Sequence, residues 1–165
     1  MEAMSDISRN PYFSGLQWDR LKLYLWYLRY EMGLDRWRLN IGYHTPAEEH
    51  PEAHQAMGYV VPVEGRYVAG IYLASDFPEM EPFKQRHVLV HELTHLYTRD
   101  ALMVVETAFK QLSESAYNVA WPTYKEAMEC QVDEIARIMA PLFKMPDLNK
   151  PLGKNARRRL ERMSE

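Results

Sequence analysis

The sequence predicts an α+β fold, in which an N-terminal helix, a three-stranded antiparallel sheet and later helices share one core. Three observations support this prediction. Apolar residues recur at helical spacing near both ends of the chain, they alternate with polar residues in short segments in between, and 165 residues suit one domain. The hydrophobic share of 47% supplies enough apolar side chains for a core. We expect the domain to cover residues 1–145 and a basic tail to cover residues 146–165.

The first helix is expected over residues 16–32, where apolar side chains occupy most of the circumference. A helix with so little polar surface should be buried on more than one side. Gly33 is expected to end it, because glycine readily adopts the backbone conformation that closes a helix. Trp37, Leu39 and Ile41 then alternate with polar residues, and this period of two predicts a strand with one covered face.

The polar, proline-containing segment over residues 44–55 is expected to be a loop. Two strands are expected next, over residues 59–63 and 67–73, and Glu64 and Gly65 between them suit the tight turn of a hairpin. We expect the strand over residues 67–73 to lie at the edge of the sheet, where an extended peptide could pair with its backbone.

Helical spacing of apolar residues returns at Pro82, a residue type suited to the first turn of a helix, and continues to about residue 97. A second helical segment is expected over residues 101–112. The last long helix is expected to begin near Pro122 and to run to about Ala140. These helices would back the sheet.

The helix that begins at Pro82 contains the sequence His-Glu-Leu-Thr-His at positions 91–95. Residues four apart on a helix lie above one another, so the imidazoles of His91 and His95 leave the same face and can bind one metal ion. Glu92 is rotated by about 100° from His91, which keeps its carboxylate beside the ion without making it a ligand. The alternative is that both histidines are ordinary residues of a half-buried helix.

A catalytic zinc site usually has three protein ligands and one open position, so two histidines need a partner. Glu129 and Asp133 are four residues apart in the last helix, on a face that borders apolar side chains, where carboxylates are costly unless paired or metal-bound. We therefore expect Glu129 to be the third ligand, because Glu126 and Glu134 lie further round towards solvent. Asp133 is expected to accept the second ring N–H of a ligand histidine, or else to form a salt bridge.

The motif at positions 91–95, with the later Glu-x-x-x-Asp spacing of residues 129–133, resembles the gluzincin class of zinc metallopeptidases. More narrowly, residues 67–141 resemble the ImmA/IrrE-like metallopeptidases of bacteria, phages and mobile elements. The resemblance implies a minimal zincin-like domain with an active-site helix and a C-terminal glutamate helix. It also implies a bound Zn²⁺ ion and a protein or peptide substrate.

In such a site zinc would lower the pKa of a bound water towards about 7. Glu92 would take the proton as general base and return it to the leaving amine. A further donor usually stabilises the developing oxyanion, and Tyr97, Tyr117 and Tyr124 are the candidates. Tyr124 is placed first because it precedes Glu129 on the same segment. The alternative for each tyrosine is packing, with the hydroxyl at the surface.

Other residues of metal-binding type receive no catalytic role. His87 lies about 12 Å from His95 along a helix axis, which makes it a packing or supporting residue and not a ligand of the same ion. Cys130 is expected to be a small buried hydrophobe. Three histidines share the polar loop with acidic residues, where a second metal site is the alternative to a solvated loop: His44, His50 and His54.

Charge and targeting signals limit the partners that we expect. The formal charge of −3 and the short apolar stretches favour neither a nucleic-acid nor a membrane partner. Residues 1–6 lack the basic start and apolar run of a secretory signal, and a single cysteine excludes an internal disulfide framework, so we expect a cytoplasmic protein. The basic residues between Lys150 and Arg162 are expected to be solvated or to dock a partner.

The leading hypothesis is a zinc-dependent metallopeptidase with His91, His95 and Glu129 as metal ligands and Glu92 as base. The first alternative is a zinc-binding regulatory or interaction protein of phage or mobile-element origin with little or no proteolysis. The second alternative is a metal-free interaction protein that works through its aromatic surface and basic tail.

Overall fold

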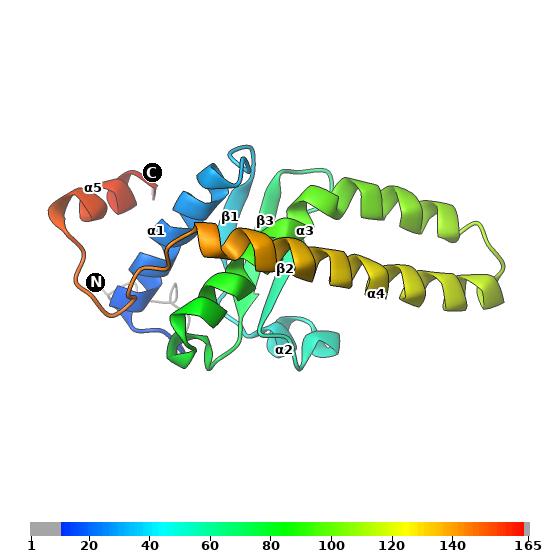
Figure 1. The fold of residues 1–165 in the computed structure, drawn as a ribbon, viewed down its shortest axis with the longest axis horizontal. Coiled ribbons are helices and arrows are strands. Elements are labelled where there is room, and N and C mark those ends of the chain that lie inside the picture. The colour runs from blue at the N-terminus through cyan, green and yellow to red at the C-terminus, as the bar shows by residue number, and fades with distance from the viewer. Residues whose placement is uncertain (1–10, 164–165) are drawn as a thin grey trace, which may run out of the picture.

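A computed structural model describes residues 11–163, so the interpretation of residues 1–6 as lacking a signal lies outside the described residues. The fold is mixed α+β, as predicted, and Figure 1 shows how its helices and its small sheet are arranged. The described helices are α1 (Gly15–Glu31), α2 (Pro46–Glu49), α3 (Pro82–Phe109), α4 (Glu114–Met139) and α5 (Lys154–Met163), and the strands are β1 (Arg38–Ile41), β2 (Gly58–Pro62) and β3 (Val68–Leu73).

The N-terminal helix α1 has the position that the sequence predicts, but its buried side chains share one face, so the expectation of burial on more than one side was wrong. Its first turn is closed by a reciprocal cap, in which the Ser14 hydroxyl accepts from the Gln17 N–H and the Gln17 side chain accepts from the Ser14 N–H. Gly33, with a φ of +66°, follows its last turn. Its buried side chains have the spacing of a single helix face: Trp18, Leu21, Tyr24, Leu25 and Leu28.

The sheet has the strand order β1-β3-β2 and is mixed, so the prediction of a purely antiparallel sheet was wrong. β2 and β3 form the predicted antiparallel hairpin, whose turn contains Gly65 with a φ of +68°. β1 pairs with β3 in parallel, with Arg38 opposite Val68. The hairpin is fixed by its local turn, whereas β1 is joined to β2 by a long connection that places it on the far side of β3. β3 is therefore central, and the expectation that it forms an edge was also wrong.

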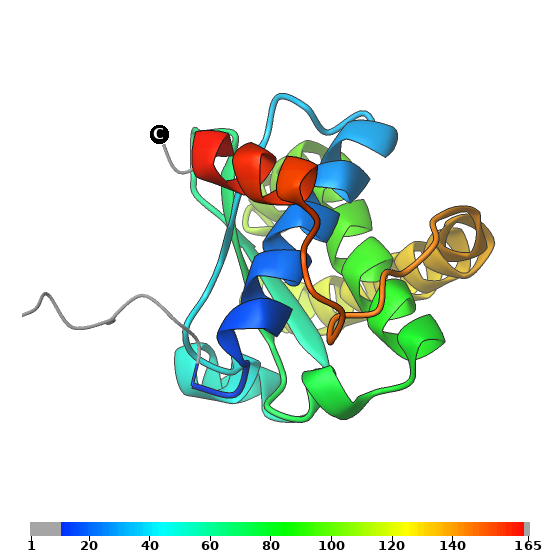
Figure 2. The same ribbon diagram turned by 90° about the vertical axis from the view of Figure 1, so that its left-hand side faces the viewer.

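One face of the sheet is covered by helices, and the other is more open. The side chains of Ala69, Ile71 and Leu73 alternate inward along β3 and are fully buried. They belong to the same core cluster as Leu89 and Leu93 of α3. α1 and α3 lie on this covered face (Figure 2), so the helix that carries the motif is fixed directly against the sheet.

α3 is one continuous helix of 28 residues, and the break expected before residue 101 is absent. α4 begins earlier than predicted, because the Ser113 hydroxyl accepts from the Ala116 N–H and caps it there, and Pro122 lies inside the helix. α3 and α4 run side by side, and their far ends extend beyond the sheet and α1 (Figure 1). We call residues 100–131 the arm.

The polar segment over residues 44–55 is not a plain loop. It folds into α2, which is capped by Thr45 in a reciprocal pair with Glu48, and then into a 3₁₀ turn at Pro51–Ala53. Proline at the start of each turn suits this geometry, because its φ is already helical and its missing N–H would have no helical partner.

Half of the basic C-terminal tail forms α5, which lies beside α1 (Figure 2). The Arg20 guanidinium on α1 donates hydrogen bonds to the carbonyls of Lys150 and Pro151, just before α5. The Arg159 guanidinium lies 4.2 Å from the ring centre of Trp26. None of the described helices combines the length and the apolarity needed to cross a lipid bilayer.

Candidate metal centre

The two histidines of the motif lie on the face of α3 that does not enter the core. Val90 and Leu93 on the opposite side are fully buried, while His91 and His95 keep side-chain exposures of 20% and 24%. The Nε2 atoms of His91 and His95 are 3.2 Å apart. The four-residue spacing therefore brings both rings to one point, and burial of the helix's other face fixes which way they point.

Glu129 reaches the same point from α4. Its Oε2 atom lies 3.5 Å from Nε2 of His91 and 3.4 Å from Nε2 of His95. A tetrahedral zinc ion with bonds of about 2.0–2.1 Å needs ligand atoms about 3.3–3.4 Å apart. The three donor atoms thus have the mutual spacing of one triangular face of such a site, and their chemistry, two imidazoles and a carboxylate, suits a divalent cation.

The pKa values of Glu129 and His91 depend on each other, because the two side chains attract. Hydrogen bonds to His91 and His95 hold the pKa of the Glu129 carboxyl far below its usual value. Burial alone would lower the pKa of His91, but the combined attraction of Glu129, Glu92 and Asp133 raises it. Glu129 is therefore ionised at neutral pH, in the form that a metal ion needs.

Glu92 is the buried carboxylate of the centre, with 6% of its surface exposed. Burial raises its pKa, although the nearby histidines and a hydrogen bond from the Val60 N–H oppose that rise. Strand β2 can approach this carboxylate because residue 58 is glycine. A Cβ at Gly58 would lie 2.7 Å from Cγ1 of Val88 and 2.9 Å from Cγ of Glu92.

Asp133 lies between two histidines of α3. Its Oδ1 atom is 2.9 Å from Nε2 of His87, within hydrogen-bond distance, and 3.6 Å from Nδ1 of His91. The carboxylate thus faces the second ring nitrogen of a candidate ligand, as expected, but its short contact is with His87. His87, His91 and Asp133 also form a second group whose ligand atoms lie within 4.8 Å of one another.

The tyrosine placed first in the sequence analysis packs within the arm. The Tyr124 ring lies 5.8 Å from that of Phe109 and 6.1 Å from that of Trp121. Tyr59 on β2 was not considered from the sequence, yet the negative charges of Glu92 and Glu129 contribute, after burial, to raising its pKa. The Tyr59 side chain itself lies on the other face of the sheet, beside Tyr72 and with its ring centre 4.8 Å from that of His50, so only the charges of the centre act on it.

The remaining polar residues have other surroundings. Glu134 pairs with Arg137 at 2.6 Å, and neither it nor Glu126 belongs to a candidate metal group among the described residues. His50 pairs with Glu52 at 3.2 Å, and the loop histidines form no metal group in the described part of the chain. Cys130 is exposed, so the expectation that it is buried was wrong.

Comparisons of the chain with models of protein families, with curated proteins and with solved structures found no match.

Proposed function

We propose that the protein is a zinc-dependent metallopeptidase of zincin-like type, in which His91, His95 and Glu129 hold the ion and Glu92 is the general base. One observation carries the proposal. Three donor atoms from α3 and α4 have the spacing of tetrahedral zinc ligands, and a buried carboxylate lies next to them. A purely structural zinc site has no use for this additional carboxylate.

An ion held by His91, His95 and Glu129 would supply Lewis acidity, which acidifies water and polarises a peptide carbonyl. Glu92 takes the proton of the attacking water and later gives it to the leaving amine. Burial raises the pKa of Glu92, and a stronger base takes the proton of water more readily. The Val60 N–H fixes the orientation of the carboxylate.

The substrate would lie along β2, the edge strand next to the centre. The backbone N–H and C=O groups of Tyr59 and Val61 point towards β3. Those of Gly58 and Val60 therefore point to the open edge, on the side of α3. The Val60 N–H already binds Glu92. An extended peptide paired with the rest of this edge would bring a carbonyl towards the ion. The sequence analysis expected residues 67–73 to pair with the substrate, and we now propose β2 for this role.

The test combines metal analysis with a cleavage assay. Purified protein loaded with zinc is incubated with a mixture of peptides from a digested proteome, and new termini are identified by mass spectrometry. We expect cleavage that a chelator abolishes and that falls by about 10²–10⁴-fold in Glu92→Gln, which loses the base. The variant should keep its zinc content and its thermal stability.

Different failures lead to different conclusions. Full zinc content without cleavage by the wild-type protein would favour the zinc-binding regulatory protein. No zinc in either protein would contradict the metal centre itself. Loss of zinc is expected for His91→Ala, His95→Ala and Glu129→Ala, and an unchanged zinc affinity in Glu129→Ala would remove Glu129 from the ligand set.

A further inference from the structure

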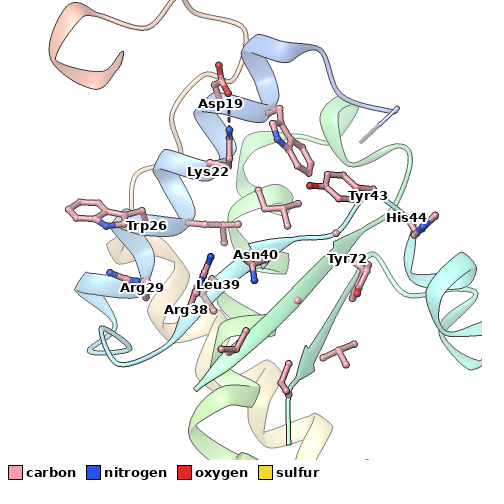
Figure 3. A pocket seen from close by; sticks show the side chains of 18 of the residues that line it. Asp19, Lys22, Trp26, Arg29, Arg38, Leu39, Asn40, Tyr43, His44 and Tyr72 are labelled. Atoms are coloured by element: carbon pink, nitrogen blue, oxygen red, sulfur yellow. Dashed lines mark ion pairs between the residues drawn. The ribbon is translucent and has the colours of Figure 1, made fainter. Parts of the chain in front are cut away.

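A recess lies at the opposite edge of the sheet, away from the metal centre. It has a volume of about 1000 Å³ and runs along β1, between α1, the open face of the sheet and the end of α5. Figure 3 shows α1, which carries Lys22, Trp26 and Arg29, beside β1, which carries Arg38 and Asn40. None of the residues assigned to the proposed hydrolysis lines this recess.

β1 presents unused backbone groups to the recess. The N–H groups of Arg38 and Gly42 donate towards the β3 side at 2.7 Å. Alternate residues of a strand face its partner, so the N–H and C=O groups of Leu39 and Ile41 point to the open edge, where no described strand pairs with them. An edge of this kind accepts another extended chain.

The recess is basic. Four basic and two acidic side chains line it. Asp19 pairs with Lys22 at 3.1 Å, and the Tyr72 hydroxyl donates to Glu49, so both acidic groups are already engaged. The arginines that remain are Arg29, Arg38 and Arg162.

One of these arginines has unused hydrogen-bonding capacity. Nη1 of Arg29 donates to the Trp37 carbonyl at 3.1 Å, but its Nε atom is buried and has no partner within the described residues. A buried guanidinium N–H without an acceptor is costly, so the described residues do not fully compensate the charge of Arg29.

Aromatic and aliphatic side chains complete the walls. Trp18 and Tyr43 stack with ring centres 6.0 Å apart at one end. Trp26 lies further along, with Arg159 of α5 over its ring. Because α5 is held against α1 through Arg20, its positive charge is kept close to the recess. The site thus combines a strand edge, apolar walls and anion-binding arginines.

We propose that this recess binds an extended, acidic peptide segment of a partner protein, which adds to the sheet beside β1 and places carboxylates on Arg29, Arg38 and Arg162. The unpaired strand edge favours a peptide over a nucleic acid, because main-chain pairing is specific to polypeptides. The site is independent of the metal, so the inference does not depend on the proposed peptidase activity.

The binding assay uses fluorescence anisotropy and a fluorescein-labelled peptide of alternating glutamate and valine. The protein is the Glu92→Gln variant, so that the peptide is not cut. We expect saturable binding that weakens by about tenfold when salt is raised from about 50 to about 300 mM, because screening reduces the attraction. A peptide with lysine in place of glutamate should not bind.

Two variants and one control localise the binding. Arg38→Glu and Arg162→Glu each reverse an exposed charge in the recess and should weaken binding about tenfold. Lys144→Glu makes the matched charge reversal at an exposed position outside the recess and should leave binding within about twofold. Equal weakening in all three would contradict the proposed site, since it would reflect net charge alone.

Two further probes test the kind of ligand. A peptide that is N-methylated at alternate amides cannot pair with a strand and should bind at least about tenfold more weakly. Equal binding of the methylated peptide would overturn the strand-addition geometry. A labelled oligothymidylate that bound more tightly than the acidic peptide, with the same sensitivity to Arg38→Glu, would overturn the peptide as ligand.

Discussion

The two halves of the α3–α4 hairpin are built differently. In the half that covers the sheet, Leu89, Leu93, Val132 and Ala136 have no exposed surface. In the arm, residues 100–131, no side chain is buried, and Val104 and Val119 are each 70% exposed. The first half is held by the common core, whereas the arm is held by pairing of its two helices and by contacts between its aromatic rings.

The candidate metal centre lies across this boundary. His91 and His95 belong to the part of α3 that the core holds, while Glu129 belongs to the arm and its side chain is 54% exposed. Burial of α3 therefore preorganises the imidazoles, whereas the position of the Glu129 carboxylate depends on how closely α4 follows α3. A bound ion would therefore crosslink a rigid part of the molecule to a less constrained one.

The largest expected effect is on stability, from matched truncations in the two halves. Leu89→Ala should destabilise the fold by about 2–5 kcal/mol, because it leaves a cavity in the core. Val104→Ala in the arm should change stability by less than about 0.5 kcal/mol, because the side chain is already exposed. Urea unfolding of both variants measures the difference. Similar losses would mean that the arm is buried in solution, for example against another chain.

A smaller effect is expected from the ion. Zinc at about one hundred times its dissociation constant should stabilise the folded protein by about 2.7 kcal/mol. Hydrogen exchange with and without zinc locates this effect, and we expect most of the added protection in the arm near Glu129. The Glu129→Ala variant is the control and should show little added protection there. Protection confined to α3 would show that the ion does not join the two halves.

The smallest effect concerns Pro122, which lies inside α4 and has no N–H for the helical hydrogen bond. Pro122→Ala should stabilise the arm by about 1–3 kcal/mol, because alanine restores that bond and favours the helix. Slower amide exchange around residues 116–124 measures it, with Thr123→Ala as a neighbouring control. Unchanged exchange would mean that the helix already accommodates the proline by bending.

Local signals predicted much of the fold. The apolar circumference and Gly33 defined α1, and the turn at Gly65 defined the hairpin, because each depends on residues close in sequence. The parallel partner of β1 was missed, since strand pairing across a long connection leaves no local pattern. The start of α4 was misplaced because Pro122 was taken for a first turn, whereas the Ser113 cap lies nine residues earlier.

The candidate site was predictable to a similar degree. The four-residue spacing of His91 and His95 placed both rings together, and the pairing of α3 with α4 brings Glu129 to them. The contact of Asp133 with His87 and the close approach of β2 to Glu92 at Gly58 were not foreseen. Both depend on the angle at which α4 and β2 cross α3, a property of the packed molecule that no single segment encodes.

The lack of a side chain at Gly58 has a consequence for genetics. Even a methyl group there would meet Glu92 and Val88 at less than 3 Å, while the histidine face of α3 would remain untouched. We therefore expect a substitution at position 58 to separate functions, because it displaces the carboxylate from the strand and leaves the three candidate ligands in place. In a cell, such an allele would distinguish the consequences of catalysis from those of the protein's mere presence.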